Sequence, residues 1–466
     1  MRRLLIAALL PVLLLVLLAA CTVGPRHRVP ETPLPARFDQ AQAEATAEPV
    51  VSSLWSGFAS TELDELIARA LEANTTIAQA AARLAETRAL SGLAIYSWFP
   101  TVTAAAGRER AQISGGEPFA PPGGLLTDTY RAGFDASWEI DLFGGLRNEN
   151  RAIKRRAEAD AALLGDAQLS IVAETAQTWF ALIGARERLE LRRQQLANQQ
   201  DGVEILEARV EAGNSSALDL AQAEAQMRSV AASIPEAEAD VVRQEQRLAV
   251  LTAWPIATLR EKISPATGIP ELPQLVATGT PEEWMKRRPD IRAAERQLAA
   301  ANSDVGDEIA EFFPKIELLG SFGWTAGDRD DIGKEGAERW SYGPSISWSF
   351  LNFGRVRQNV KAAEARRDGA IALYQETVLQ ALEETENALA GFRTANRSED
   401  ELRAGAAAAF EAARLARMRY DVGAGDYLAV LDAERTQLDL EDQHLQSETR
   451  RVTALAALYK ALAGDL

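Results

Sequence analysis

The chain has 466 residues, of which 47% are hydrophobic, so it has enough apolar material for a folded core and is not expected to be disordered. Its formal net charge of -17 makes nucleic acid a poor partner. Cys21 is the only cysteine, which excludes an intrachain disulfide and a thiolate metal site. We expect no cofactor and no metal centre.

The first 20 residues have the pattern of a signal peptide. Arg2 and Arg3 precede an apolar run from Leu4 to Ala20 that is interrupted by Pro11. This run is too short and wrongly flanked for a stable membrane span, so residues 1–20 are predicted to be removed on export. Loss of the two arginines changes the net charge from -17 to -19.

The end of this run resembles a bacterial lipobox, Leu18-Ala19-Ala20-Cys21. Cleavage would leave Cys21 as the first residue, with a thiol that takes lipid, including a palmitate chain. By the same resemblance, Thr22 rather than Asp after the cysteine directs the anchor to the outer membrane. The alternative is an ordinary signal peptide followed by an incidental cysteine. Residues 21–54 are predicted to form a lipid-anchored arm.

The chain is an internal duplication. With a shift of 210 residues, nine positions recur: Trp138, Phe143, Gly144, Arg147, Arg209, Gly213, Leu218, Ala223 and Glu224 become Trp348, Phe353, Gly354, Arg357, Arg419, Gly423, Leu428, Ala433 and Glu434. Upstream the shift is 214, because Phe99 and Pro100 recur as Phe313 and Pro314. We predict repeats at 55–254 and 284–466, a linker at 255–283, and the four-residue difference in a surface loop.

Four segments alternate between apolar and polar residues and predict β-strands near 101–110, 130–141, 315–325 and 340–351. In the last, large apolar residues alternate with serine and glycine from Trp340 to Phe350. No segment after the signal peptide approaches about 18 uninterrupted apolar residues, so a membrane crossing would have to use strands. Pro344 donates no ladder hydrogen bond, and we expect a local irregularity there.

A water-soluble sandwich would also show this alternation. Aromatic residues along the apolar face, with Ser, Asp and Arg opposite, favour a barrel with lipid outside and a polar lumen. An open sheet cannot leave unpaired edges in hydrocarbon. One chain supplies four strands, two chains would give about eight strands around a filled interior, and three would give about twelve and leave a lumen. The strand count therefore predicts an oligomer.

Long helices are expected over 148–212 and 356–422, where proline is absent and Ala, Leu, Glu, Gln and Arg dominate. Each would extend roughly 100 Å. Apolar residues recur every seven positions, at Leu182, Leu189, Leu196, Val203 and Val210, and at Leu431, Leu438, Leu445, Val452 and Tyr459. This heptad spacing predicts coiled-coil-like packing. A solvated rod or an ordinary helical bundle would show it too, but continuity with the strands favours a helical tube that prolongs the barrel.

Each long helix is predicted to end at a glycine turn, at 212–216 and at 422–426. Gly213 and Gly423 supply the left-handed cap, and Ser or Asp opens the next helix. These tips are expected to lie farthest from the membrane.

With these features in place, the chain resembles the outer membrane factor family of TolC type, in particular its lipoprotein branch that serves resistance-nodulation-division pumps. The resemblance covers the whole mature chain. It is most specific at four motifs: Cys21-Thr22-Val23-Gly24-Pro25; Arg287-Arg288-Pro289-Asp290-Ile291 continuing to Ala294-Glu295; Phe312-Phe313-Pro314; and Arg419-Tyr420 through Gly423 to Val430-Leu431-Asp432-Ala433.

The resemblance implies a mixed α+β membrane protein, a homotrimer with a 12-stranded outer-membrane β-barrel continued by a periplasmic α-helical barrel. It also implies two partners, a periplasmic adaptor protein and an inner-membrane resistance-nodulation-division transporter. The periplasmic gate would use Asp432, Tyr420 and Arg419. The tips that contact the adaptor would be Gly213, Leu218, Val422 and Gly423. Ala429 and Gly425 depart from an acidic and an arginine position found in some relatives.

Three Asp432 side chains that meet on a pore axis would repel one another and attract cations. Taken by itself, Asp432 is better explained as a solvated helix position. Only the resemblance favours the gate.

Nothing in the sequence indicates catalysis. The two histidines, His27 and His444, have no partner constellation in the sequence and are expected to be solvated. No phosphate loop or nucleophile motif accompanies them.

The predicted function is therefore an outer-membrane exit duct for small toxic compounds or drugs, anchored by lipid and extending into the periplasm. The alternatives are a duct for secreted polypeptides in a type I secretion system, which the lipobox disfavours, and a structural coiled-coil lipoprotein without a pore.

Overall fold

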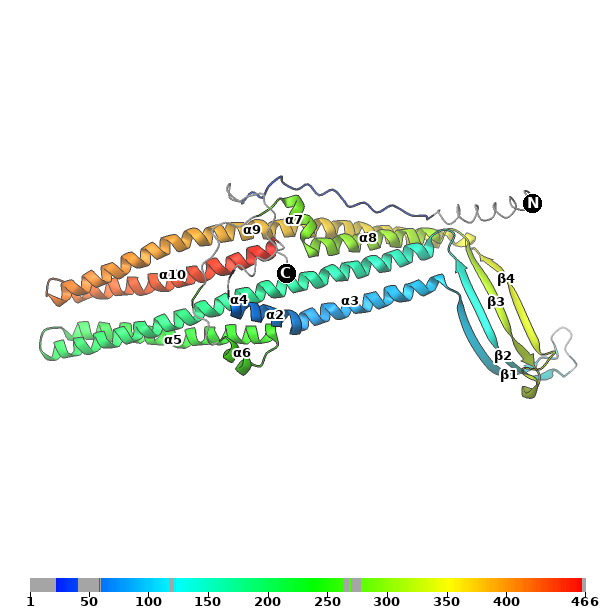
Figure 1. The fold of residues 1–466 in the computed structure, drawn as a ribbon, viewed down its shortest axis with the longest axis horizontal. Coiled ribbons are helices and arrows are strands. Elements are labelled where there is room, and N and C mark those ends of the chain that lie inside the picture. The colour runs from blue at the N-terminus through cyan, green and yellow to red at the C-terminus, as the bar shows by residue number, and fades with distance from the viewer. Residues whose placement is uncertain are drawn as a thin grey trace. The chain divides into compact units, whose positions relative to one another are not determined.

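The computed structural model describes residues 22–40, 58, 60–116, 121, 123–263, 268–269 and 278–462. Their elements follow one order twice, helices, two strands and two long helices (Figure 1). The first repeat comprises α2 (Thr61–Ala73), α3 (Thr75–Ala94), η2 (Ile95–Trp98), β1 (Thr101–Ile113), β2 (Leu125–Ile140), α4 (Gly145–Glu211), α5 (Ala217–Thr252) and α6 (Ile256–Lys262). The second comprises α7 (Pro281–Arg287), α8 (Pro289–Ala310), β3 (Lys315–Ala326), η3 (Arg329–Asp331), β4 (Glu338–Ser347), η4 (Phe350–Asn352), α9 (Phe353–Asp421) and α10 (Tyr427–Ala461).

The chain divides into two compact units. One consists of Met1–Glu31, Arg83–Ala161 and Ala293–Gln375 and contains the sheet. The other consists of Thr32–Ala82, Ala162–Arg292 and Glu376–Leu466 and contains α2, α5, α6, α7, α10 and the C-terminal parts of α4 and α9.

The four strands form one antiparallel sheet in the order β1-β2-β3-β4. The register sets Ala104, Phe134, Phe322 and Trp340 in one row. The next row, on the opposite face, consists of Thr103, Asp135, Ser321 and Ser341. The Ser321 and Ser341 hydroxyls are hydrogen-bonded at 2.8 Å. One face of the sheet is therefore apolar and the other polar, as predicted.

The irregularity expected at Pro344 is absent, so that prediction is wrong. Pro344 pairs with Leu318 within an unbroken register from Lys315↔Ser347 to Trp324↔Glu338. In the single subunit β4 is an edge strand of the sheet, where a missing N–H is tolerated. The predicted strand end at 351 is also wrong, because β4 ends at Ser347 and residues 350–352 form a 3-10 turn.

The four extra residues of the first repeat lengthen its hairpin instead of its loop. Thirteen residue pairs join β1 to β2, whereas ten join β3 to β4. The pairs nearest the helices, Thr101↔Ser137 and Lys315↔Ser347, correspond through the duplication. The difference therefore lies at the far end of the hairpin, where longer pairing satisfies more backbone groups than a longer loop would.

On the polar face, two glycines allow β2 and β3 to approach closely. Gly133 and Gly323 are directly paired. A Cβ on Gly323 would lie 2.4 Å from the Ala132 carbonyl oxygen, and a Cβ on Gly133 would lie 2.6 Å from that of Phe322. Larger residues would force the strands apart, so this part of the sheet requires glycine on both strands.

The duplication is visible in a repeated contact at the base of each hairpin. The indole Nε1 of Trp138 donates to the Trp98 carbonyl at 3.0 Å, and that of Trp348 donates to the Phe312 carbonyl at 3.1 Å. Both acceptors precede a Phe-Pro pair. Equivalent residues therefore fix the passage from helix to strand in both repeats.

The long helices agree with the heptad prediction. α4 has 67 residues and α9 has 69. Leu182, Val203, Leu431, Val452 and Tyr459 are buried. The other heptad positions are half-buried: Leu189, Leu196, Val210, Leu438 and Leu445. Within the described ranges, the helices lack the length of uninterrupted apolar sequence needed to cross a bilayer.

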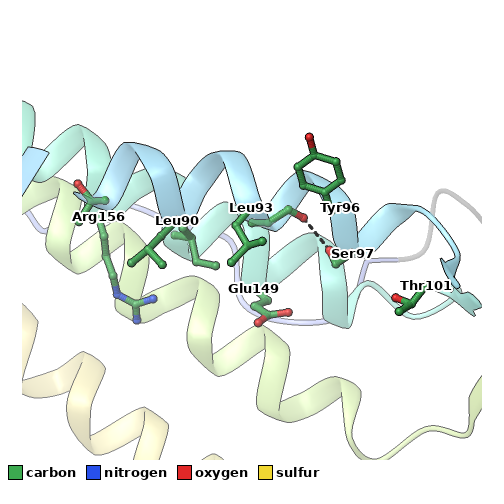
Figure 2. Close-up of a pocket in the computed structure, with 10 residues that line it drawn as sticks. Leu90, Leu93, Tyr96, Ser97, Thr101, Glu149 and Arg156 are labelled. Atoms are coloured by element: carbon green, nitrogen blue, oxygen red, sulfur yellow. Dashed lines mark hydrogen bonds between the residues drawn. The ribbon is translucent and has the colours of Figure 1, made fainter. Parts of the chain in front are cut away.

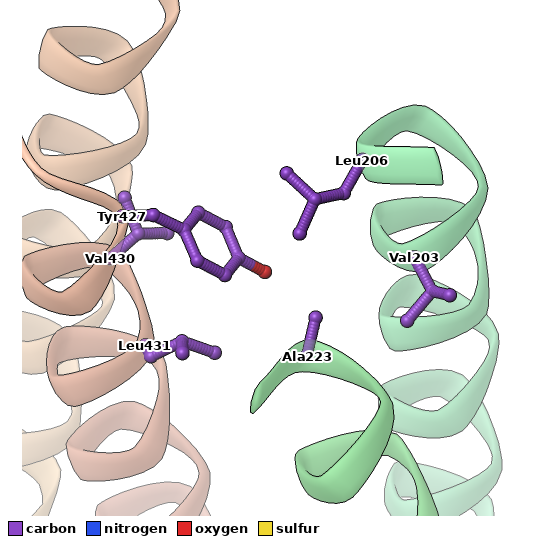
Figure 3. Packing of buried hydrophobic residues seen from close by; sticks show 6 residues of the cluster. All are labelled: Val203, Leu206, Ala223, Tyr427, Val430 and Leu431. Carbon is purple, nitrogen blue, oxygen red and sulfur yellow. The ribbon is translucent and has the colours of Figure 1, made fainter. Parts of the chain in front are cut away.

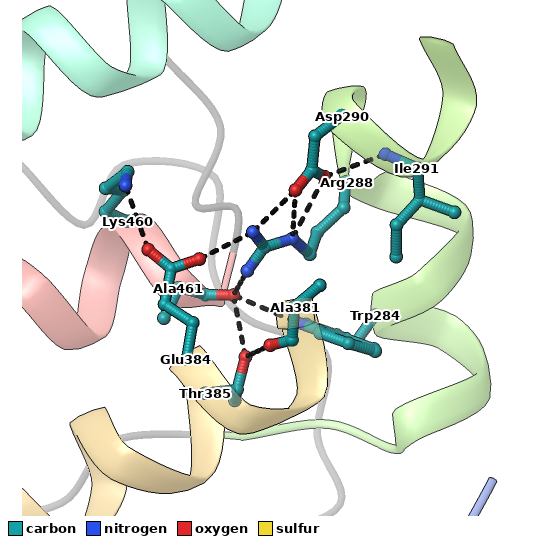
Figure 4. Close-up of polar contacts among 9 residues, drawn as sticks. All are labelled: Trp284, Arg288, Asp290, Ile291, Ala381, Glu384, Thr385, Lys460 and Ala461. Atoms are coloured by element: carbon teal, nitrogen blue, oxygen red, sulfur yellow. Dashed lines mark hydrogen bonds and ion pairs between the residues drawn. The ribbon is translucent and has the colours of Figure 1, made fainter. Parts of the chain in front are cut away.

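A polar cluster holds the C-terminal end of α10 (Figure 4). The carbonyl oxygen of Ala461 accepts hydrogen bonds from Trp284 Nε1 at 2.8 Å and Arg288 Nη1 at 3.0 Å. Thr385 on α9 donates to the same oxygen at 3.2 Å. Arg288 also pairs with Glu384 at 2.6 Å. Because this carbonyl ends a helix, the three donors satisfy a group that would otherwise be unpaired, and they join α7, α9 and α10.

Candidate functional site

The two turns at the ends of α4 and α9 have the same hydrogen-bond pattern. In the first, Gly213 N donates to Val210 O and Asn214 N donates to Arg209 O, at 2.9 and 2.8 Å. In the second, Gly423 N donates to Tyr420 O and Ala424 N donates to Arg419 O, again at 2.9 and 2.8 Å. Gly213 and Gly423 have φ values of 77° and 72°. These are Schellman caps, and glycine is needed because a side chain would be strained at that φ.

The next helix begins immediately after each turn. Ser216 and Asp219 form a capping box at the start of α5. Asp426 caps α10 by accepting from Leu428 N at 3.2 Å. The turns therefore reverse the chain within a few residues, as predicted, and each long helix forms a tight hairpin with its successor.

The two hairpins are packed together just below these turns (Figure 3). The buried cluster consists of Val203, Leu206, Ala223, Tyr427, Val430 and Leu431. Tyr420 is packed against it, with its ring centroid 5.1 Å from that of Tyr427. Burial raises the pKa of Tyr427 to about 12, so its phenol remains neutral. An apolar centre therefore fixes the tips of both repeats to each other.

Polar contacts at the surface link the same turns. Arg209 on α4 pairs with Asp421 on α9 at 2.9 Å, and its guanidinium lies 5.0 Å from the centre of the Tyr420 ring. The Tyr420 hydroxyl is hydrogen-bonded to Ser215 at 2.7 Å. The neighbouring Tyr420 and Asp421 raise the pKa of Arg209, which keeps the ion pair charged. We call Arg209, Ser215, Tyr420 and Asp421 the tip latch.

The structure places Tyr420 in this latch but gives the other predicted gate residues no part in it. Arg419 is exposed and donates to the Ala424 carbonyl in its own turn, at 3.4 Å. Asp432 is exposed, and within the described part of the chain no hydrogen bond or ion pair of its carboxylate is found. Gly425 lies against Arg419, because a Cβ on it would approach the Arg419 Cβ to 3.3 Å.

Two of the predicted adaptor contacts are apolar and exposed. Leu218 follows the first turn with 66% of its surface exposed, and Val422 precedes Gly423 with 75% exposed. Leu428 on α10 is exposed too. Contact of these residues with an adaptor stays a prediction.

Sequence reasoning missed three of the four latch residues: Arg209, Ser215 and Asp421. A partial signal was available, because Arg209 recurs as Arg419 four residues before the glycine of each turn. The pattern does not show which of the two arginines finds a carboxylate on the other hairpin.

The expectation of solvated histidines is wrong. His27 Nε2 lies 3.4 Å from Glu295, and His444 Nε2 lies 3.5 Å from Glu399 and 3.7 Å from Glu448. The contacts with Glu295 and Glu399 could not be seen in the sequence, because they join distant segments, whereas Glu448 lies four residues after His444 on the same helix.

Glu399, His444 and Glu448 are close enough to share a metal ion. Glu399 is already paired, however, with Arg403 and, at 3.4 Å, with Arg451. Burial alone would raise the pKa of Glu399, but Arg403 and Arg451 hold it below its usual value. The group is therefore an ion-pair network.

Cys21 lies outside the described residues, but the residues after it are held firmly. Val23 N donates to the Phe143 carbonyl at 3.1 Å, and Asn148 Nδ2 donates to the Val23 carbonyl at 2.9 Å. Thr22 fills the space beside Gly144, where a Cβ would come within 2.6 Å of it. The start of the arm is thus fixed where β2 passes into α4.

In the described part of the chain, an amphipathic sheet with two unpaired edges is continued by long helices that end in capped hairpins, and this combination defines a channel-forming subunit. A sequence model of the family "Outer membrane efflux protein" matches residues 66–253 and 280–464, so the chain belongs to this family. The two matches agree with the tandem duplication.

The chain is similar to known proteins over nearly its whole length. It is 32% identical to the outer membrane protein OprJ of Pseudomonas aeruginosa, with 96% of this chain and 93% of OprJ covered. It is 30% identical to the solvent efflux pump outer membrane protein SrpC of Pseudomonas putida, with 98% and 97% covered. A solved structure of the outer-membrane channel OprN has a TM-score of 0.90 and 35% identity, with 95% of this chain and 99% of that chain covered.

These findings confirm the predicted family, the mixed α+β fold of an outer-membrane channel and the outer-membrane location extending into the periplasm. The role as the outer-membrane component of an efflux system is confirmed as well. Homotrimeric assembly with a periplasmic adaptor and an inner-membrane pump is confirmed for the family.

Proposed function

We propose that this protein is a passive exit duct for small toxic compounds, in which three copies enclose one polar lumen and perform no catalysis. The observation that carries the proposal is the sheet. Its polar face contains Asp135, Ser321 and Ser341, and its apolar face contains Phe134, Phe322 and Trp340. In the part of the chain that the structure describes, β1 and β4 have no partner strand on their outer sides. Neighbouring copies would supply those partners and close the ring.

The helices nearest the sheet also leave apolar surface for a neighbouring copy. A hollow of about 500 Å³ is lined by Leu90, Leu93 and Tyr96 on α3 and η2 and by Glu149 and Arg156 on α4 (Figure 2). Leu90, Leu93 and Tyr96 are exposed in the single subunit. Packing of another subunit there would remove this apolar surface from water.

For the periplasmic entrance we propose a closed state held within each subunit by the tip latch and lined on the axis by Asp432. The latch links α4 to α9 through Arg209–Asp421 and Ser215–Tyr420. The unpaired, exposed carboxylate of Asp432 is available to face the pore. Adaptor binding at Gly213, Leu218, Val422 and Gly423 would act on the same turns that carry the latch.

The test of the entrance is cation block in planar bilayers. Asp432→Ala should leave the trimer intact and weaken block by a divalent cation about fivefold, because one charge pair at about 4 Å contributes about 1 kcal/mol in water. Asp439→Ala is the control, since Asp439 is an exposed carboxylate on the same helix. Unchanged conductance and unchanged cation block in Asp432→Ala would contradict the proposed role of Asp432 at the entrance.

For the cargo, we propose small, largely apolar toxic compounds. One relative is called a solvent efflux pump outer membrane protein. The lipobox favours efflux over type I polypeptide secretion, the second candidate. Adjacent genes that encode an adaptor and a proton-driven transporter would support efflux, whereas an ATP-driven exporter beside the gene would favour secretion.

A further inference from the structure

Two arginines lie on the apolar face of the sheet. Arg108 and Arg110 occupy even-numbered positions of β1, on the same face as Ala104. The register places this face with Phe134, Phe322 and Trp340. Both arginines are more than half exposed, with 52% and 58% of their side chains accessible. Cations on a face of this kind require an explanation, because a buried position in hydrocarbon would be costly for them.

A single carboxylate serves both arginines. Arg108 donates to Asp128 Oδ1 from Nε at 3.1 Å and from Nη2 at 2.9 Å. Its guanidinium also lies 5.4 Å from the centre of the Tyr130 ring. Arg110 Nε is 3.9 Å from Asp128 Oδ2, too far for a hydrogen bond. The three residues therefore keep a net charge of about one positive unit, and among the described residues no hydrogen bond from the Arg110 guanidinium is found.

The duplication indicates at which level of the membrane these residues lie. With the shift of 214, Arg108 and Arg110 correspond to Phe322 and Trp324 of β3. With the shift of 210, Tyr130 corresponds to Trp340 of β4. Phe322, Trp324 and Trp340 belong to a band of aromatic residues, and such bands lie at the boundary between hydrocarbon and headgroups. The first hairpin thus presents arginines at the level where the second presents aromatic rings.

The position along the strands shows which leaflet is involved. β1 begins at Thr101, next to the helices, and Arg108 and Arg110 lie near its other end at Ile113 (Figure 1). In an outer-membrane channel whose helices extend into the periplasm, that end of the hairpin faces the cell exterior. The arginines therefore lie at the headgroups of the outer leaflet.

We propose that Arg108 and Arg110, held by Asp128 and Tyr130, bind the phosphate of a lipid headgroup in the outer leaflet. A guanidinium offers a planar pair of donors that matches phosphate oxygens. Tyr130 and Asp128 orient Arg108, and Arg110 retains donors for the ligand. The inference rests on the proposed function only in its placing of the sheet in the outer membrane.

The test compares lipid retention by purified trimers. The trimer is exchanged into micelles that contain diphosphorylated lipid A, the same lipid after complete dephosphorylation, or phosphatidylethanolamine, and bound lipid is counted by native mass spectrometry. The Arg108→Gln/Arg110→Gln variant should retain about thirtyfold less phosphorylated lipid than the native protein, because each arginine contributes about 1 kcal/mol at an anionic lipid surface. The native protein should retain little of the other two lipids.

The chain offers a matched control and a variant that should increase lipid retention. Arg131 pairs with Glu109 at 3.1 Å on the polar face, at the same end of the sheet, so Arg131→Gln should leave lipid retention unchanged. Asp128→Asn keeps a side-chain oxygen that can accept from Arg108 but removes the negative charge that opposes anion binding, so it should increase retention.

Several outcomes would overturn the proposal. They are equal retention of the dephosphorylated lipid, equal loss in Arg131→Gln, or decreased retention in Asp128→Asn. Displacement of the lipid by millimolar inorganic phosphate alone would show a free-phosphate site and would also count against it. Efflux by native and variant proteins is measured in parallel, so that a failure of the exit duct is distinguished from a failure of lipid binding.

Discussion

The ionised carboxylate of Asp307 on α8 is unfavourable in the folded protein. Burial raises the pKa of Asp307 to about 6, with Glu149, Glu308 and Glu311 acting in the same direction. Glu149 and Asp307 both line a cavity of about 280 Å³ where α4 and α8 meet the strands. At neutral pH the folded protein therefore holds this carboxylate charged among other carboxylates, which costs stability.

The pH dependence of stability follows from this shift. An unfolded Asp titrates near about 3.9, so Asp307 binds its proton more tightly in the folded state, and its own contribution to the free energy of unfolding should rise as the pH falls from about 7 to about 4. Asp307→Asn removes the charge and should raise the free energy of unfolding at pH 7 by about 1–2 kcal/mol, after allowance for solvent screening, and by nothing at pH 4.

Thermal unfolding of the purified trimer between pH 4 and pH 8 measures this effect. Asp368→Asn is the control, because Asp368 is exposed beside Arg367 and should leave the pH dependence unchanged. If Asp307→Asn and the native protein show the same pH dependence, the cost assigned to Asp307 is wrong.

Residues of the candidate site were predictable to different degrees. Gly213 and Gly423 follow from local chemistry, because a left-handed cap needs glycine wherever the chain turns back. Tyr420 was named through the family resemblance. Its partners Arg209 and Ser215 come from the other repeat, more than 200 positions away, so only packing of the two hairpins reveals them.

At the scale of elements, the pairing of β2 with β3 depends on the close contact of Gly133 with Gly323. Gly323→Ala would place a Cβ 2.4 Å from the Ala132 carbonyl oxygen. The strands would have to separate locally, which should cost about 1–3 kcal/mol and lower the temperature at which the trimer dissociates in a heat-modifiability gel.

Gly343→Ala on β4 is the matched control. A Cβ there would meet nothing within 4 Å, so the dissociation temperature should stay unchanged. Equal effects of the two substitutions would show that glycine matters through backbone entropy and not through the close contact of β2 with β3.

Sequence patterns were sufficient to locate the helices and strands but not to fix where each strand ends. Alternation and the absence of proline located all four strands and both long helices. Alternation could not show that β1 continues to Ile113 or that β4 stops at Ser347, because Trp348 and Phe350 keep the alternating pattern after the pairing has ended. Strand ends depend on hydrogen bonds with the neighbouring strand, which the pattern of one segment does not contain.

For the whole molecule, the predicted lipid anchor at Cys21 would add to a surface that already favours the membrane. Cys21→Ser should abolish acylation and still leave trimers in the outer membrane, because the apolar face of the sheet provides large burial in lipid. The fixed contacts of Val23 with Phe143 and Asn148 should remain.

Membrane fractionation with labelled palmitate checks this expectation. Loss of label with the protein still in the outer-membrane fraction is the expected result. Unlipidated protein found entirely in the soluble periplasmic fraction would show that the strands do not hold the molecule in lipid.

The sequence by itself determined the duplication, the amphipathic strands, the long helices and their glycine caps, because each depends on residues near one another in the chain or on comparison of the chain with itself. The tertiary structure decided the partners of those residues. Arg209 with Asp421, Gly133 with Gly323, and Ala461 with Trp284 and Arg288 join distant segments, and such contacts depend on register and packing geometry that periodicity does not encode.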